Sequence, residues 1–289
     1  MVSSYSKSME KMLPKVCSLP TGYLAMLFLL ILGWGEPSIA TDRVRHGIYA
    51  WQSDKLLSSK SSPSEVATLS QYGITRLYLG LSSDQLQTPS QTHYALNNLI
   101  ESAHAQNISV HLLLGDPDWI APQHQRKLLT IIRTLEHVPF DGLMLDIEIE
   151  QSQVPEQDRV RLWQETVDQV AKRSPWPITS ASHWRWYSKN PAVCEQNKSL
   201  SSASLMIYST NVEVVHQRVL EAKAACPDAR ISVSASVESI LSSQESWAGS
   251  TGFDEAREHL EKALAGTGVE SIDWQDWESL KQMPATASH

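Results

Sequence analysis

The sequence is poor in basic residues, and this shortage limits the classes of ligand that the protein could bind. Lys and Arg number 24 against 32 Asp and Glu, which gives a formal net charge of −8 at pH 7. No basic patch stands out along the chain. Nucleic-acid binders need such patches to neutralise backbone phosphates. We therefore expect no nucleic-acid partner and an uncharged or cationic ligand.

The sequence also lacks a hydrophobic run long enough to span a membrane. Its longest apolar run, residues 23–34, is short of the roughly 20 residues that a spanning helix needs. Lysines precede this run, and the small residues Ser38 and Ala40 follow it. This order is typical of an export signal. We expect residues 1–40 to be a signal peptide cleaved after Ala40, leaving an exported domain of residues 41–289 without stable membrane insertion. The alternative is an uncleaved N-terminal anchor.

Cysteine is scarce, and its spacing excludes common metal sites. Of the three cysteines, Cys17 would leave with the signal, so Cys194 and Cys226 remain. In an oxidising compartment this pair predicts one disulfide, and the alternative is two buried free thiols. No Cys-x-x-Cys or His-x-x-x-His spacing indicates a zinc site. We expect neither a metal nor a cofactor.

Strand-like and helix-like patterns alternate through the rest of the chain. No Gly-x-Gly-x-x-Gly follows the first strand, so an open sheet with a dinucleotide site is not indicated. Eight strands alternating with helices predict a single (β/α)8 TIM barrel. The polar stretch 184–203 predicts an irregular, loop-rich fifth unit. The expected strands are 46–51, 74–81, 108–114, 140–148, 177–182, 204–208, 230–237 and 269–274, and the expected helices are 63–72, 92–106, 121–137, 155–173, 212–225, 254–265 and 278–282.

The fourth strand combines an apolar face with acidic side chains. Strand side chains alternate between faces, so Leu143 and Leu145 point one way while Met144, Asp146 and Glu148 point the other. The two acids are about 6–7 Å apart along a strand. In a TIM barrel the loops after the strands build the active site. We therefore expect Asp146 and Glu148 to act on one substrate.

Other residues that can contact a ligand follow other strands. Tryptophan is abundant, with ten residues against three Phe, and its ring is a common platform for sugars. Trp51, His183, Trp184 and Glu238 lie at or after strand ends and are candidate substrate contacts, although each can equally be a surface-loop residue. Glu150 is expected to be solvated. His46 and His111 are expected in the core or at the barrel floor.

The fourth strand resembles the signature of the family 18 glycoside hydrolases, the chitinase-like group. That signature reads Asp-Gly-apolar-Asp-apolar-Asp-x-Glu, and residues 141–148 match it at every specified position except Met144, where the family usually has Asp. The Met-x-Tyr of the family's sixth strand is matched by Met206 and Tyr208. Trp274 is a candidate for the Trp that closes the sugar site from strand eight, and Gly115 stands near the family's glycine pair.

The resemblance implies hydrolysis of a polysaccharide that contains N-acetylated amino sugars, with retention of configuration. Glu148 would protonate the glycosidic oxygen and then activate water. Asp146 would orient the 2-acetamido group, whose carbonyl oxygen attacks the anomeric carbon, and Tyr208 would donate a hydrogen bond to that carbonyl. Asp141 and Gly142 would have structural roles.

Met144 leaves two further hypotheses open. Without the family's Asp, the barrel could bind carbohydrate or a protein partner without cleaving it. It could also hydrolyse a glycan without acetamido groups, using Glu148 and another carboxylate such as Glu238.

Overall fold

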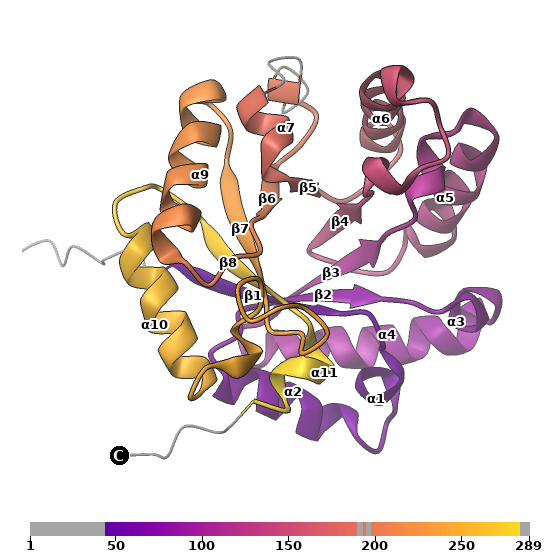
Figure 1. The fold of residues 1–289 in the computed structure, drawn as a ribbon. Helices are drawn as coiled ribbons and strands as arrows, with labels where there is room; N and C mark the ends of the chain where they lie inside the picture. The colour runs from indigo at the N-terminus through magenta and orange to yellow at the C-terminus, as the bar shows by residue number, and fades with distance from the viewer. Residues whose placement is uncertain (1–43, 190–192, 195–197, 284–289) are drawn as a thin grey trace, which may run out of the picture. The chain divides into compact units, whose positions relative to one another are not determined.

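Eight parallel strands close into a barrel at the centre of the protein. A computed structural model describes residues 44–189, 193–194 and 198–283. Each strand pairs with the next in sequence, and β8 pairs with β1 (Figure 1). The expected (β/α)8 barrel is therefore confirmed. The strands are β1 (Arg45–Ala50), β2 (Arg76–Gly80), β3 (Ser109–Leu114), β4 (Gly142–Asp146), β5 (Ile178–His183), β6 (Ser202–Met206), β7 (Ile231–Ser236) and β8 (Ser271–Gln275).

Helices fill the connections and surround the barrel (Figure 1). None of the helices in the described ranges is long and apolar enough to cross a membrane. The expected signal and its cleavage site after Ala40 lie outside the described residues. The α-helices are α1 (Asp54–Leu57), α2 (Ser62–Gln71), α3 (Ser83–Gln87), α4 (Pro89–His104), α5 (Pro122–Leu135), α6 (Glu156–Ala171), α7 (Trp184–Lys189), α9 (Val212–Ala225), α10 (Phe253–Leu264) and α11 (Trp277–Leu280); the 3-10 helices are η1 (Pro117–Ile120), η2 (Ile149–Gln151) and η3 (Trp247–Gly249).

Strand β4 has the two faces that its sequence predicts. Leu143 and Leu145 belong to the large hydrophobic cluster between the strands and the helices. Met144 belongs to a separate cluster inside the barrel, where it meets Tyr49 and Tyr78. The alternation of a strand therefore directs the even-numbered residues of β4 toward the interior and its end.

Hydroxyl groups and one buried carboxylate occupy much of the barrel interior. Asp273 of β8 is fully buried and accepts hydrogen bonds from Ser204 Oγ at 2.7 Å and Ser271 Oγ at 3.0 Å. Ser234 lies 2.8 Å from Ser204 and 3.2 Å from the hydroxyl of Tyr49, which extends the network to β7 and β1. Buried polar groups need such partners because an unpaired one destabilises the folded state.

The fifth unit contains a short helix and a disulfide. Helix α7 has only six residues and begins directly where β5 ends. A disulfide joins Cys194 to Cys226, the C-cap residue of α9, with a Cα–Cα distance of 5.3 Å. The predicted cysteine pair is thereby confirmed.

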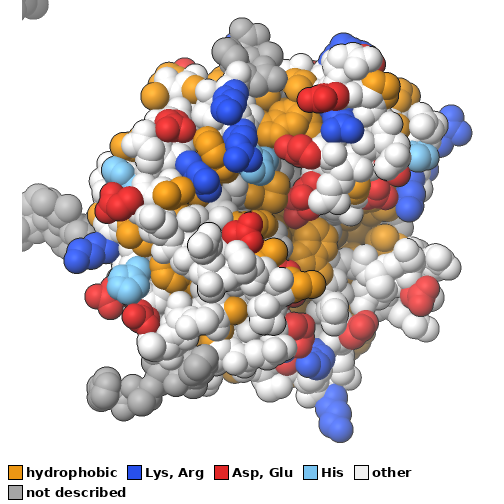
Figure 2. Space-filling view, in the orientation of Figure 1, with side chains coloured by type: hydrophobic (Ala, Val, Ile, Leu, Met, Phe, Trp, Pro, Cys, Tyr) orange, Lys and Arg blue, Asp and Glu red, His pale blue; other side chains and the backbone are white. Residues whose placement is uncertain are grey.

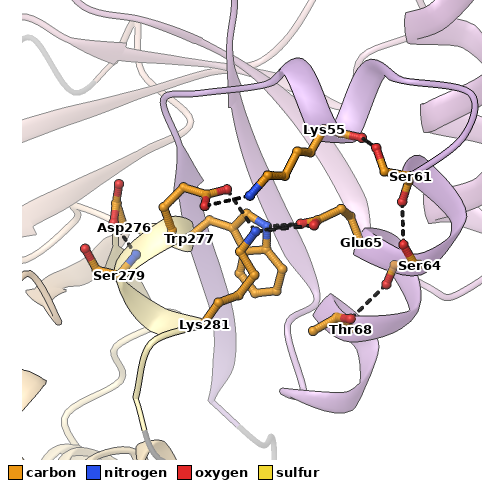
Figure 3. A network of polar contacts seen from close by, with 10 residues as sticks. Lys55, Ser61, Ser64, Glu65, Thr68, Asp276, Trp277, Ser279 and Lys281 are labelled. Atoms are coloured by element: carbon orange, nitrogen blue, oxygen red, sulfur yellow. Dashed lines mark hydrogen bonds and ion pairs between the residues drawn. The ribbon is translucent and has the colours of Figure 1, made fainter.

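A polar clasp formed by Lys55, Glu65, Trp277, Glu278 and Lys281 joins the last helix to the first two (Figure 3). The carboxylate of Glu65 on α2 accepts hydrogen bonds from Trp277 Nε1 at 2.6 Å and Lys281 Nζ at 3.0 Å. Glu278 accepts from Lys281 at 2.8 Å and from Lys55 at 3.2 Å. The clasp therefore reinforces the closure of β8 onto β1.

Candidate functional site

Asp146 places a buried carboxyl group at the mouth of the barrel, the ring formed by the C-terminal ends of the strands. It is the last residue of β4 and only 6% exposed. Within the described residues, its Oδ1 atom has no hydrogen-bond partner. Burial, and then the nearby charge of Glu148, raises the pKa of Asp146 to about 7. This carboxyl group therefore exchanges its proton near neutral pH.

Glu148 lies beyond the end of β4, at the N-cap of η2. The fourth strand was expected to reach Glu148, but β4 ends two residues earlier, at Asp146. The side chain of Glu148 is exposed, and its Oε2 atom accepts a hydrogen bond from Gln151 Nε2 at 2.7 Å. An acid in this position is open to a ligand arriving from solvent.

Tyr208, just beyond the end of β6 at Met206, belongs to the same site. Its side chain is partly buried, and burial raises the pKa of its hydroxyl well above the ordinary value. The charges of Asp146, Glu148 and Glu238 raise the pKa further, in that order. The phenol therefore stays protonated as a hydrogen-bond donor beside three carboxyl groups.

Glu238 follows β7 and is the third carboxyl group of this cluster. Ser236 Oγ donates a hydrogen bond to its Oε2 atom at 3.1 Å. Partial burial raises the pKa of Glu238, the hydrogen bond from Ser236 opposes this, and the charge of Asp276 adds to the rise. Four of the residues named from the sequence, Asp146, Glu148, Tyr208 and Glu238, are therefore brought together.

Trp51 supplies an aromatic surface at the mouth. Its side chain is 39% exposed, and its ring stacks on Tyr49 with 6.5 Å between ring centroids. Its Nε1 atom donates a hydrogen bond to Gln275 at 3.3 Å. The ring lies so close to Gly115 that a Cβ there would stand 2.8 Å from it. Gly115 is therefore needed for this position of the ring.

Trp274 is not at the mouth, contrary to its expected place in the sugar site. Its side chain is fully buried in the outer layer, where it packs on Phe253 at 4.9 Å and donates a hydrogen bond to His46 Nδ1 at 3.2 Å. In β8 the inward residues are Ser271, Asp273 and Gln275, because side chains alternate along the strand. Gln275 was missed from the sequence, although the same alternation identifies it.

A pocket of about 500 Å³ opens beside the acidic cluster, between the segments that follow β4 and β5. His183 lines it as expected, but Trp184 does not. Trp184 instead packs between the guanidinium groups of Arg185 and Arg218, at 5.0 and 4.6 Å from its ring centroid. The aromatic side chain of the pocket is Trp186, whose indole N–H donates to Glu150. Glu150 was expected to be solvated. It is exposed, but it also accepts this hydrogen bond from Trp186.

Asp141 and Gly142 act on the structure below the mouth. Asp141 Oδ2 accepts hydrogen bonds from the backbone N–H of Val110 at 2.7 Å and from His104 Nε2 at 2.8 Å. A Cβ at Gly142 would stand 2.2 Å from Nδ1 of His111. Burial and the charge of Arg76 lower the pKa of His111 to about 3, so this ring is neutral in the barrel floor.

Met144 fills the interior position where the family signature has Asp. It is fully buried, and its Sδ atom lies 3.9 Å from the hydroxyl of Tyr49. Asp146 consequently has no carboxyl partner two residues before it. In the described part of the chain, no group of three His, Cys, Asp or Glu side chains is arranged to hold a metal ion.

Comparisons with known proteins relate this chain to others through its fold. No protein-family model matches the sequence, and no curated protein matches it. Among solved structures, the spore cortex-lytic enzyme SleL of Bacillus cereus is similar, with 12% identity and a TM-score of 0.53, covering 85% of this chain and 76% of that one.

Two further structures have the same kind of barrel. A GH18 chitinase from Pseudoalteromonas aurantia has 11% identity and a TM-score of 0.55, covering 81% of this chain and 94% of the chitinase. A xylanase-alpha-amylase inhibitor protein, solved with trehalose, has 12% identity and a TM-score of 0.56, covering 82% and 94%. At these identities the likeness shows the fold alone.

Proposed function

We propose that the protein is an exported glycoside hydrolase that cleaves a polysaccharide containing N-acetylated amino sugars. The observation that carries this proposal is the buried Asp146 beside Glu148 and Tyr208 at the mouth of the barrel. The similar barrel of a chitinase supports it, and the Cys194–Cys226 disulfide supports an oxidising compartment. Residues 1–40 would be the signal peptide that is removed.

Each residue of the cluster has a role in the proposed reaction. Glu148 protonates the glycosidic oxygen and, after the leaving group departs, takes a proton from the attacking water. The acetamido carbonyl oxygen of the substrate attacks the anomeric carbon, so no protein nucleophile is needed. Tyr208 donates a hydrogen bond to that carbonyl. Asp146, once ionised, holds the acetamido N–H and stabilises the positive charge that develops.

Aromatic and polar groups around the cluster would bind the sugar ring. The exposed face of Trp51 offers a stacking surface, and Gln275 holds its indole N–H. In this proposal Trp51, directly after the first strand, takes the place that the family gives to a Trp of the eighth strand. His183 would line the neighbouring pocket.

Replacing Glu148 by Gln tests the proposal. We expect E148Q to release reducing ends from acetylated chitooligosaccharides about 100-fold more slowly than the wild type, because general acid–base catalysis contributes at least that factor. Glu101→Gln, at an exposed position of α4, is the matched control and should keep full activity. Equal rates for E148Q and the wild type would show that the assignment is wrong.

A barrel that binds carbohydrate without cleaving it is the second candidate function. Met144 favours it, because Asp146 lacks the partner that the signature supplies. The similarity to an inhibitor protein is consistent with such a role. Calorimetry that detects oligosaccharide binding while no product forms would favour this candidate over the hydrolase.

Hydrolysis of a non-acetylated glycan is the third candidate function. It is favoured by Glu238, whose carboxyl group lies in the same cluster and has a raised pKa. Such an enzyme would use Glu148 and Glu238 as its two carboxyl groups. Cleavage of a substrate without acetamido groups separates it from the first proposal, since substrate assistance then cannot operate.

A further inference from the structure

Three cationic side chains gather on one side of the mouth, although the sequence is acidic and has no basic patch. Arg185 and Lys189 project from α7, and Arg218 comes from α9. The two arginines share the ring of Trp184, at 5.0 and 4.6 Å from its centroid. Figure 2 shows Lys and Arg side chains gathered near exposed hydrophobic side chains. Folding thus creates a positive region that no stretch of sequence contains.

The electrostatic influence of this region is visible in its neighbours. Burial and then the charge of Arg185 lower the pKa of Arg218. Burial and then Arg185 also lower the pKa of His183, whose Nε2 atom accepts a hydrogen bond from Arg185 at 3.2 Å. Arg185 and Arg218 lie at the same Trp184 ring, and their like charges repel one another. A bound anion would relieve that repulsion.

Two of the three cations border a cavity that is large enough for a ligand and that shares lining residues with a recess at Glu148. Arg185 and Lys189 line the pocket of about 500 Å³ together with the ring of Trp186. A narrow recess lined by Glu148, His183 and Trp186 adjoins it. A sugar next to the one held at Glu148 would therefore enter the pocket.

The other charged residues of the pocket, Glu150, Glu156 and Arg159, come from η2 and α6. Glu150 accepts a hydrogen bond from Trp186, and Glu156 begins α6. The guanidinium of Arg159 donates hydrogen bonds to the backbone carbonyls of Val154, Ser152 and Glu150. These bonds fix the loop after β4 and occupy donors that a ligand would otherwise use. Arg185 and Lys189 are exposed on α7 and remain accessible to a ligand.

We propose that this pocket binds an anionic substituent on the sugar that neighbours the cleaved residue. The substrate would then be an acidic glycan. The expectation of an uncharged or cationic ligand, drawn from the net charge, would not hold for this pocket. Guanidinium and ammonium groups bind carboxylates and sulfates through charge-assisted hydrogen bonds, while Trp186 offers a surface for the sugar ring. The inference rests on the proposed function for the placement of the cleaved sugar at Glu148.

Calorimetry on the E148Q protein, in which we expect cleavage to be about 100-fold slower, tests the anion site. The carboxylate probe is a tetrasaccharide of alternating N-acetylglucosamine and glucuronic acid, and its methyl ester is the neutral control. We expect the acid to bind about tenfold more tightly at low salt, and the preference to shrink near 0.5 M salt. A 6-sulfated N-acetylglucosamine tetrasaccharide with its unsulfated partner distinguishes sulfate from carboxylate recognition.

Charge removal at the pocket provides the second comparison. K189M and R185Q should each reduce the preference for the charged probe while the neutral probe binds as before. Lys262→Met, at an exposed position of α10, is the matched control and should keep the preference. Equal binding of charged and neutral probes, or a preference that persists in both variants, would overturn the proposal.

The outcome is separable from that of the proposed hydrolase. Wild-type cleavage of neutral acetylated oligosaccharides without any preference for charged probes would refute the anion site alone. Preferential binding of a charged probe by a wild-type protein that cleaves no glycan would refute the hydrolase alone.

Discussion

Burial of Asp146 couples its ionisation to the stability of the barrel. The folded state raises its pKa from 3.8 to about 7, mainly through burial. Well below pH 3.8 the carboxyl group is protonated in both the folded and the unfolded state, and burying it then destabilises the folded state least. As pH rises toward 7, the unfolded chain ionises first and the folded state loses stability.

Asp146→Asn should remove this pH dependence. Relative to the wild type, we expect the variant to gain stability as pH rises from about 4 to 7, by up to about 4 kcal/mol, and to gain no more above that. Denaturant titrations of both proteins at several pH values measure the difference. A difference that is constant across the range would contradict the raised pKa.

The sequence was enough to predict the positions of some residues of the site, but not of others. Asp146, Glu148 and Tyr208 were predictable because a short signature and strand ends place them at one edge of the barrel. Trp274 was misplaced because its position at a strand end says nothing of the face on which it lies. Trp184 was misplaced because α7 begins immediately after β5 and turns this ring toward α9, leaving Trp186 at the pocket.

At the scale of elements, α11 is secured to the start of the barrel by the clasp of Figure 3. Glu65 is its centre, with hydrogen bonds from both Trp277 and Lys281. Its side chain is only 14% exposed, so water screens these contacts less than at an open surface.

Glu65→Gln should therefore weaken the attachment of α11. The change keeps the side-chain size but removes the negative charge, and we expect a loss of about 1–3 kcal/mol in the free energy of unfolding. Hydrogen exchange at α11 should accelerate more than at α5, which the clasp does not touch. Glu258→Gln, at an exposed position of α10, is the control. An equal effect of the two substitutions would argue against the clasp.

The elements themselves were largely predictable, and their ends were not. The helix expected at 121–137 forms as α5 (Pro122–Leu135), where Leu128, Ile132 and Leu135 are buried. The fourth strand was extended to Glu148 because acids continue its alternating pattern, whereas the chain turns into η2. Turns of this kind depend on tertiary contacts that local sequence does not encode. The proximity of Arg185 and Arg218, which belong to different helices, could not be predicted from the sequence either.

At the scale of the whole molecule, the interior network around Asp273 joins strands from both ends of the chain. Arg76 of β2 lies in the same interior, and it donates to the hydroxyl of Tyr78 at 3.0 Å. The charge of Asp273 acts on both of these residues. Removing Asp273 would take away one of the negative charges that act on the buried Arg76, and would leave Ser204 and Ser271 without this acceptor.

Asp273→Ala should accordingly lower the free energy of unfolding by about 3–5 kcal/mol. Ser232→Ala, which removes one hydroxyl bonded to Ser271 at 2.8 Å, should lower it by only about 1 kcal/mol. Denaturant midpoints of the purified variants give both values. Similar losses for the two variants would indicate that Asp273 is no more than an ordinary hydrogen-bond acceptor.

The same interior network has a consequence for how the chain folds. Its hydroxyls belong to β1, β6, β7 and β8. Ser204 is 30 residues from Ser234 and 69 from Asp273, whereas Tyr49 finds its partner Ser234 only when segments 185 residues apart have met. In a barrel whose strands have not all paired, the hydroxyls of this network lack the partners that they have in the closed barrel. Intermediates of that kind are disfavoured, and formation of these long-range contacts is slow. We therefore expect ring closure to be late, cooperative and rate-limiting.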